Sequence, residues 1–535
     1  MKNTCIIIAI LTLWILSVSF AEVSKDRFSR PEIYFRFQIE SKDELIEITR
    51  IISIDNVIGD TVYAYANRKE FEKFQKLNKK IEILPAPSLM FKPEMSQSVK
   101  KATEWDSYPT YDAYVSMMYQ FAEDYPEICR IDSIGASVNG RAILFTKISD
   151  NVNSDEAEPE FLYTSTMHGD ETTGFVLMLR LIDYLLRNYG VNEKVTYLVD
   201  NLEIWINPNA NPDGSYFCGN DSVYGAIRYN ANSVDLNRNF PDPKYGDHPD
   251  GNQWQPETVA MMDFADQHHF VLSANFHGGA EVVNYPWDCW ERRHADDEWL
   301  IWLCRQYADT VHAYSPSGYM DHLNDEYFNN GIINGYDWYP IYGGRQDYMT
   351  YFQHCRETTI EISDTKLLPA SLLPAHWEYN RAALLNYMAA ALTGIRGEVK
   401  YGSDPLNVQV RIIDHEKDNS WVFSDSVLGD YYRLCLPGVY DLEFSNDLFT
   451  KVIRQISVEP GNATMENVFI QSGSLGDINN DGFVNITDIM RVVNFITGRL
   501  TPSNEEFNRS DWNSDNELNI ADIIGITQYI LNQSP

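Results

Sequence analysis

A histidine and a glutamate three positions apart, His168 and Glu171, lie in a polar turn between an apolar stretch and a helix-like stretch. An imidazole nitrogen and a carboxylate at this spacing can bind one zinc ion, which needs a third protein ligand and keeps a fourth position for water. Alone, such a pair also fits an ordinary polar loop. The candidate third ligand is His277, which ends the apolar run 270–276 and precedes two glycines. Taken alone, His277 would be interpreted as a buried structural histidine.

Six motifs follow one another in order through residues 104–392. They read H-x-x-E from His168, N-P-D-G from Asn211, R-Y-N-A-N-S-V-D-L-N-R-N-F from Arg228, H-G-G from His277, W-Y-P from Trp338 and T-I-E-I from Thr359. Together they resemble the zinc metallocarboxypeptidases, and their spacing is similar to that of the carboxypeptidase N/E subfamily. The resemblance implies an α/β fold with a mixed β-sheet flanked by helices. It also implies one catalytic Zn²⁺ on His168, Glu171 and His277, and hydrolysis of C-terminal peptide bonds.

The resemblance assigns roles to five further residues. Glu361 matches the general base and acid, and a carboxylate inside an apolar strand pattern is costly to bury without a purpose. Arg228 matches the arginine that stabilises the oxyanion. Asn237 and Arg238 match the pair that binds the terminal carboxylate, to which a guanidinium can donate two parallel hydrogen bonds. Tyr339 matches the mobile tyrosine that closes over substrate. As isolated residues, these would be interpreted as an ion-paired glutamate, surface arginines and a core tyrosine.

Two residues bear on substrate preference. Asp288 and Gln346 match the subfamily's positions in the pocket for the C-terminal side chain. An acid there would pair with Lys or Arg and reject apolar side chains. Arg345, next to Gln346, would neutralise Asp288 if it turned inward. The alternatives are a carboxypeptidase of broad or apolar specificity, one that acts on cell-wall peptides, and a non-catalytic peptide-binding protein.

A twelve-residue pattern occurs twice near the C-terminus, at 477–488 and 511–522. Oxygen ligands at loop positions 1, 3, 5, 9 and 12 suit calcium, so the repeat predicts two Ca²⁺ sites. Position 12 is Asp rather than Glu, and Asn516 replaces the glycine found at Gly482. The predicted ligands are Asp477, Asn479, Asp481, Asn485 and Asp488 in the first loop and Asp511, Asn513, Asp515, Asn519 and Asp522 in the second.

Each of these loops precedes a helix-like run, at 489–496 and 523–531. The duplicated loop–helix arrangement at 475–535 resembles a dockerin module. Dockerins bind cohesin modules on scaffolding or cell-surface proteins, so the resemblance implies a cohesin-type partner and tethering of the chain. A calcium-stabilised terminal cap without a partner is the alternative.

Alternating apolar strands and amphipathic helices fill the central unit, 104–392. Strands are expected at 161–166, 202–206, 270–276 and 358–362, and a largely buried helix at 173–188. At 395–471, short strands between turn residues predict an all-β sandwich. The sequence GDYYRLCLPGVYDL at 429–442 makes this region similar to the transthyretin-like domain of the same subfamily.

Residues from about 31 to 90 alternate strand-like and helix-like stretches, which predicts a small α+β domain at 22–90. Its layout resembles the inhibitory prodomains of some metallocarboxypeptidases. We therefore expect it to assist folding or to block the cleft, with a plain structural or binding role as the alternative. The stretch at 91–103 has no periodicity and is expected to be a linker, so that cutting within 85–103 would release the domain.

The first 21 residues have a basic start, an apolar run and small residues at Ser19 and Ala21, which predicts a secretory signal and an extracellular protein. An uncleaved membrane anchor is the alternative, although the run is short for a bilayer span. The net charge of −35 argues against nucleic-acid binding. Six cysteines remain after residue 21 without metal-type spacing, which leaves disulfides open.

Overall fold

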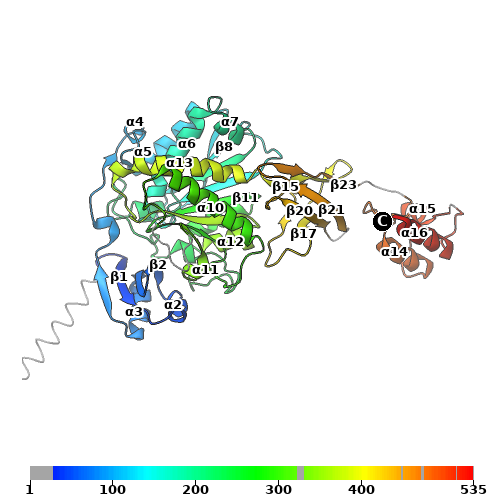
Figure 1. Ribbon diagram of the computed structural model, residues 1–535, viewed down its shortest axis with the longest axis horizontal. Helices are drawn as coiled ribbons and strands as arrows, with labels where there is room; N and C mark the ends of the chain where they lie inside the picture. Colours follow the sequence, from blue (N-terminus) through cyan, green and yellow to red (C-terminus); the bar gives the residue numbers. More distant parts are fainter. Residues whose placement is uncertain (1–27, 322–329, 447–449, 471–474, 514, 534–535) are drawn as a thin grey trace, which may run out of the picture. The chain divides into compact units, whose positions relative to one another are not determined.

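The computed structural model describes residues 28–321, 330–446, 450–470, 475–513 and 515–533. The expected signal segment, 1–21, lies outside the described residues. The chain divides into two compact units, one of Met1–Ser154 with Glu160–Ala390 and one of Asp155–Pro159 with Ala391–Pro535 (Figure 1). Within the described residues, no helix combines the length and the apolar character that a bilayer crossing requires.

The N-terminal domain has a four-stranded antiparallel sheet in the order β2-β3-β1-β4 and two short helices. Alternate residues of β1, among them Phe35 and Phe37, are buried and pack against Phe71 and Phe74 of α3. This agrees with the predicted α+β class. Its elements are β1 (Glu32–Gln38), α2 (Lys42–Ile48), β2 (Ser53–Ile58), β3 (Thr61–Asn67), α3 (Arg68–Phe74) and β4 (Ile81–Leu84).

The segment 85–103, which includes the expected linker at 91–103, contains short elements. These are η2 (Pro87–Leu89), β5 (Met95–Ser96), which pairs in parallel with β6 (Tyr108–Pro109), and α4 (Val99–Ala102). The buried Ser88 hydroxyl donates a 2.6 Å hydrogen bond to the carbonyl oxygen of Ala226. Met90 is 64% exposed. The segment is therefore packed at both ends and accessible near Met90.

The central domain is built on an eight-stranded mixed sheet in the order β13-β12-β14-β11-β9-β10-β8-β7. The central strands β14, β11, β9 and β10 run parallel, while β12 and β8 run antiparallel to their neighbours in this set. This confirms the predicted fold class. The strands are β7 (Cys129–Ala136), β8 (Ala142–Ile148), β9 (Glu160–Ser165), β10 (Glu203–Asn207), β11 (Phe270–His277), β12 (Ala280–Tyr285), β13 (Ile332–Asn334) and β14 (Arg356–Ser363).

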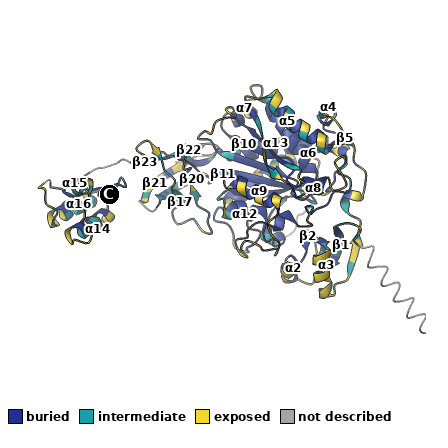
Figure 2. Ribbon diagram, turned by 180° about the vertical axis from the view of Figure 1, so that it is seen from behind, coloured by how far each residue is buried: buried dark blue, intermediate teal, exposed yellow. Residues whose placement is uncertain are grey.

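Helices cover both faces of this sheet. On one face, Phe161 and Tyr163 of β9 contact Tyr387 of α13, and on the other, Phe145 of β8 packs on Phe264 of α9. The helix α6 is buried around most of its circumference, as expected (Figure 2). The helices are α5 (Tyr111–Asp124), α6 (Thr173–Asn188), α7 (Glu193–Val199), α8 (Pro212–Ser215), α9 (Pro256–Ala265), α10 (Asp297–Tyr314), α11 (Gly335–Trp338), α12 (Arg345–Tyr351) and α13 (Leu373–Ala390).

In its described residues, the second unit contains two small sheets and three helices. One sheet is centred on β15 (Gly394–Tyr401) and includes β19 (Asp430–Arg433). The other has the order β18-β17-β20-β21, and buried residues of both sheets form one core. The remaining elements are β16 (Asp404–Pro405), β17 (Gln409–Ile412), β18 (Val422–Phe423), β20 (Gly438–Ser445), β21 (Thr450–Val458), β22 (Ala463–Met465), β23 (Val468–Ile470), α14 (Ile486–Ile496), α15 (Asn504–Ser510) and α16 (Ile520–Gln533).

All six cysteines within the described residues are free. The disulfides that the sequence left open therefore do not form in this structure, and five of the six cysteines are buried. The free cysteines are Cys129, Cys218, Cys289, Cys304, Cys355 and Cys435.

Candidate active site and calcium loops

The predicted metal ligands meet at one edge of the large sheet. His168 and Glu171 lie in the turn between β9 and α6, and His277 is the last residue of β11. The two strands are parallel neighbours, with Ser165 opposite Phe276. Because the carboxyl ends of parallel strands lie at the same edge of a sheet, segments more than a hundred residues apart come together there.

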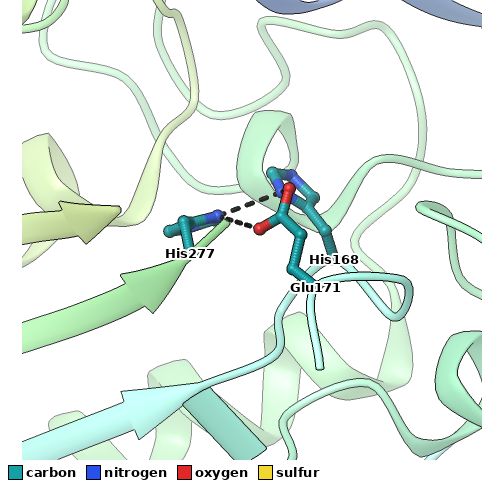
Figure 3. Close-up of side chains that lie close together, drawn as sticks. All are labelled: His168, Glu171 and His277. Atoms are coloured by element: carbon teal, nitrogen blue, oxygen red, sulfur yellow. Dashed lines mark hydrogen bonds and ion pairs between the residues drawn. The ribbon is translucent and has the colours of Figure 1, made fainter. Parts of the chain in front are cut away.

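The three side chains point toward one another, as Figure 3 shows. The Nδ1 atom of His168 lies 2.9 Å from Oε1 of Glu171, and the Nδ1 atom of His277 lies 2.8 Å from Oε2. The two Nδ1 atoms are 3.0 Å apart. All three residues are buried. Two imidazole nitrogens and one carboxylate are the donor set of a catalytic zinc site, so the residues present fit Zn²⁺.

The outer nitrogen of each imidazole has a partner that sequence analysis missed. His168 Nε2 lies 3.0 Å from Oδ1 of Asp235, and His277 Nε2 lies 2.8 Å from the side-chain nitrogen of Asn275. A partner on the outer nitrogen fixes the orientation of a metal-binding histidine. Burial lowers the pKa of His277 to about 4, which favours the neutral form that binds metal. Asp235 lies within the motif that begins at Arg228, so this motif could have indicated it as a site residue.

Glu361 lies beside the ligands because β14 pairs in parallel with β11. Glu361 is the register partner of His277, and it lines the same cavity as the three ligands. Its Oε2 atom is buried and has no hydrogen-bond partner among the described residues. Burial, and then the charge of Glu171, raise its pKa well above the usual range of a glutamate. A carboxylate in this environment holds a proton readily, as a general base and acid must.

The residues expected to bind substrate line the same cavity. Arg238 is 7% exposed, and its Nε and Nη2 atoms have no hydrogen-bond partner within the described part of the chain. A buried guanidinium with free donors is suited to an incoming carboxylate. Asn237 and Tyr339 also line this cavity. Arg228 donates from Nε to Oδ2 of Asp235 at 3.0 Å.

Asp288, which is expected to set substrate preference, also lines this cavity. Asp288 is buried there, and Gln346 donates a 3.0 Å hydrogen bond to its Oδ1 atom. Burial, and then the charge of Asp347, raise the pKa of Asp288 well above its usual range. Arg345, in contrast, turns away from Asp288. Its Nη2 atom lies 2.9 Å from Oε2 of Glu357, which is fully buried.

Residues of the N-terminal domain enter this site, and no motif indicated them. The Ser53 hydroxyl donates a 2.7 Å hydrogen bond to Asp235, the partner of His168. Asp55 lies 3.6 Å from Nη1 of Arg228, and its carbonyl oxygen accepts a 3.5 Å hydrogen bond from Tyr339. The cavity that remains around the ligands has a volume of about 20 Å³. That volume holds a water molecule or two and is too small for a peptide.

The first calcium loop gathers carboxylates around one point. Asp477, Asp481 and Asp488 are buried, and they form one of the groups whose oxygen atoms lie close enough to hold a cation. Burial raises the pKa of Asp488 to about 6. Asn479 hydrogen-bonds Asp481, whereas the Asn485 side chain accepts from the backbone of Thr487 and caps α14. The donor set fits Ca²⁺, which prefers oxygen ligands.

The second calcium loop repeats these backbone contacts. Asp511 accepts from the amide of Asp515 at 3.0 Å, as Asp477 accepts from that of Asp481 at 2.9 Å. Asn516 has φ of +62°, and Gly482 at the same loop position has φ of +84°. Asparagine tolerates this left-handed conformation better than most residues, so the replacement preserves the turn. Asp522, like Asp488, accepts from backbone amides of its own loop, and the remaining predicted ligands are Asn513 and Asn519.

Comparisons with known proteins agree with this geometry. A family model described as zinc carboxypeptidase matches residues 114–383, and one described as dockerin type I domain matches residues 475–531. Mouse carboxypeptidase D is 36% identical over 371 residues, which cover 68% of this chain. The human carboxypeptidase N catalytic chain is 34% identical over 395 residues, with 68% of this chain and 85% of that protein covered.

The match to carboxypeptidase D spans only 27% of that longer protein. Among solved structures, carboxypeptidase A from Helicoverpa armigera is similar in fold, with a TM-score of 0.50 and 19% sequence identity. The match covers 68% of this chain and 99% of that one.

Proposed function

Because the chain belongs to the zinc carboxypeptidase family, we propose that it removes single residues from the C-termini of peptides in a zinc-dependent reaction. The observation on which the proposal rests is the convergence of His168, Glu171 and His277 in one cavity with Glu361 and Arg238. This arrangement supports the presence of a metal site, a proton acceptor and a carboxylate-binding group close together. An exopeptidase needs all three.

In the proposed reaction, Glu361 accepts a proton from the attacking water and then donates it to the leaving nitrogen. Arg238 and Asn237 bind the terminal carboxylate and so select the last peptide bond of the chain. Arg228 donates to the carbonyl oxygen as negative charge develops on it. Tyr339 closes over the bound substrate. Zinc, when bound by the two histidines and Glu171, supplies Lewis acidity.

A scan of peptides that differ only in the C-terminal residue tests this function. The products should be the free C-terminal amino acid and a peptide shortened by one residue. Removal of zinc with a chelator should abolish turnover, and added Zn²⁺ should restore it. Internal cleavage, or turnover that is unaffected by metal removal, would contradict the proposal.

We propose further that the preferred C-terminal residues are Lys and Arg. The cation would meet Asp288 at the end of the pocket, with Gln346 holding that carboxyl in place. An apolar side chain would bring no cation to the buried Asp288 carboxyl, which is unfavourable. The contact of Arg345 with Glu357 supports the proposal, because it keeps the Arg345 guanidinium from pairing with Asp288.

The N-terminal domain is proposed to inhibit the enzyme until the segment 85–103 is cut. Two observations support this proposal: Ser53 and Asp55 contact site residues, and only a small cavity remains. Cleavage near the exposed Met90 would separate the domain from the cleft. The cut enzyme should then have a higher kcat/KM than the full-length chain. Equal values would indicate a structural role instead.

The C-terminal module is proposed to bind two Ca²⁺ ions and to tether the enzyme to a cohesin-type partner outside the cell. The supports are the dockerin match and the loop geometry. A pull-down with an immobilised cohesin, with and without calcium, tests the proposal. Binding that persists without calcium, or no binding with it, would contradict it.

A further inference from the structure

Lys366 is a buried cation five residues beyond Glu361, with a side chain that is 2% exposed. Its Nζ atom lies 2.5 Å from Oε1 of Glu171 and donates a 3.1 Å hydrogen bond to the carbonyl oxygen of Gly278. Its third partner is Oδ1 of Asp55, at 2.7 Å. The ammonium group therefore contacts a proposed zinc ligand, the backbone beside another, and the N-terminal domain.

The main chain and the side chain of Lys366 both contact the turn that contains Glu171. The amide of Thr172, the residue after Glu171, donates a 3.1 Å hydrogen bond to the carbonyl oxygen of Lys366. The turn after β9 is thus joined through Lys366 to Gly278, which follows His277. Glycine suits position 279 for two reasons. A Cβ atom there would lie only 3.3 Å from Nζ of Lys366, and the φ of +122° is rarely adopted by other residues.

The carboxylate of Glu171 has one oxygen toward each imidazole. The terminal torsion of a glutamate is broad, so the two imidazoles alone define the carboxylate plane weakly when no metal is bound. A contact from Lys366 to Oε1 adds a third fixed point. The geometry points to Lys366 as a positioning residue that holds Glu171 ready for Zn²⁺. This inference rests on the proposed zinc site.

Two other roles for Lys366 predict different results. If Lys366 only docks the N-terminal domain through Asp55, then loss of either residue would affect zinc binding equally little. If its positive charge mainly repels the metal, then loss of Lys366 would tighten zinc binding. Loss of an outer contact to a metal ligand typically weakens metal affinity by about 10–100-fold, which is the size of effect expected here.

The test measures the zinc affinity of full-length K366M by competition with a chromophoric chelator. Two variants are measured beside it. D55N removes the charge of the N-terminal partner alone. K147M removes a matched buried lysine, which pairs with Glu203 at 2.6 Å in the same sheet, away from the proposed ligands. Circular dichroism checks that each variant is folded, and K366Q replaces K366M if the latter does not fold.

We expect K366M to bind zinc about 10–100-fold more weakly than the wild type, with K366R intermediate and D55N and K147M within about threefold. Wild-type affinity in K366M, tighter binding, or equal weakening in D55N would overturn the role of Lys366. Failure of the wild type itself to bind one zinc would instead contradict the proposed function. The two failures are therefore distinguishable.

Discussion

The proposed zinc site and the first calcium loop both gather cation ligands, but from very different distances along the chain. His168 and His277 are 109 positions apart and meet because β9 and β11 are neighbours in the sheet. The calcium ligands all fall within 477–488, and backbone amides of the same loop orient them. The zinc site therefore depends on the whole central domain, whereas each calcium loop depends mainly on itself.

This difference has a consequence for regulation. A site assembled from distant strands has an open edge that another domain can cover, and Ser53 and Asp55 occupy that edge here. A loop that folds around its own ion has no comparable opening, because its ligands face inward. The comparison predicts that changes at the active site alter catalysis strongly, and that changes in the calcium loops leave it nearly unaffected.

The largest effect is expected for E361Q. Loss of the proton acceptor should lower kcat by about 10²–10⁴-fold, while zinc content stays at the wild-type value. Turnover and metal content are measured on the same preparation. The matched control is E203Q, which alters a buried glutamate paired with Lys147 and should retain turnover. Near-normal activity of E361Q would disprove its assignment as the base.

The next effect is expected for D288N, which removes the charge at the end of the specificity pocket. The ratio of kcat/KM for peptides ending in Arg to that for peptides ending in Leu should fall by about 10²-fold. The Leu peptide serves as the internal control, since its rate should hold or rise. An unchanged ratio, or equal rates on both peptides in the wild type, would remove Asp288 from the specificity argument.

A smaller effect is expected from pH, which should change inhibition by the N-terminal domain by about tenfold. Burial, and then the charge of Asp170, raise the pKa of Glu32 from 4.5 to about 8, and burial raises that of Glu70 to about 7. Because the docked state binds protons more tightly than the free state, docking is strongest below about pH 4.5 and weakens as pH rises to about 8.

The corresponding measurement is the kcat/KM of the full-length chain relative to that of the cut enzyme. This ratio should increase between pH 5 and pH 8, and E32Q should reduce the increase. Glu32 accepts hydrogen bonds from the amides of Arg228 and Tyr229, which a glutamine can still accept. A ratio that is constant, or that decreases with pH, would contradict the expected sign.

The smallest effect on catalysis is expected for the double variant D477A/D511A. It removes the first ligand of each calcium loop, so calorimetry should show loss of calcium binding and of the calcium-dependent transition of residues 475–533. The kcat/KM should remain within about twofold of the wild type. A parallel loss of activity would show that the two regions are coupled.

Local structure could be predicted from this sequence because local periodicity specifies it. The helix expected at 173–188 has those bounds in the structure, and His277 ends its strand as expected. The proposed zinc ligands and Glu361 could also be named from the sequence, because each lies in a motif that is defined by residue type and short spacing. The strand β2 is only weakly marked by periodicity, because Asp55 and Asn56 interrupt its apolar pattern.

Contacts between distant segments were decided only by the tertiary structure. The sequence alone determined an α/β domain with a metal-binding residue set, a β-sandwich and a duplicated calcium-type loop. It left open whether Arg345 turns toward Asp288, and packing answers this with the buried Arg345–Glu357 pair. It indicated neither the entry of Asp55 into the site nor the contact of Lys366 with Glu171. Such contacts depend on which surfaces meet across more than a hundred residues, and no short pattern specifies that.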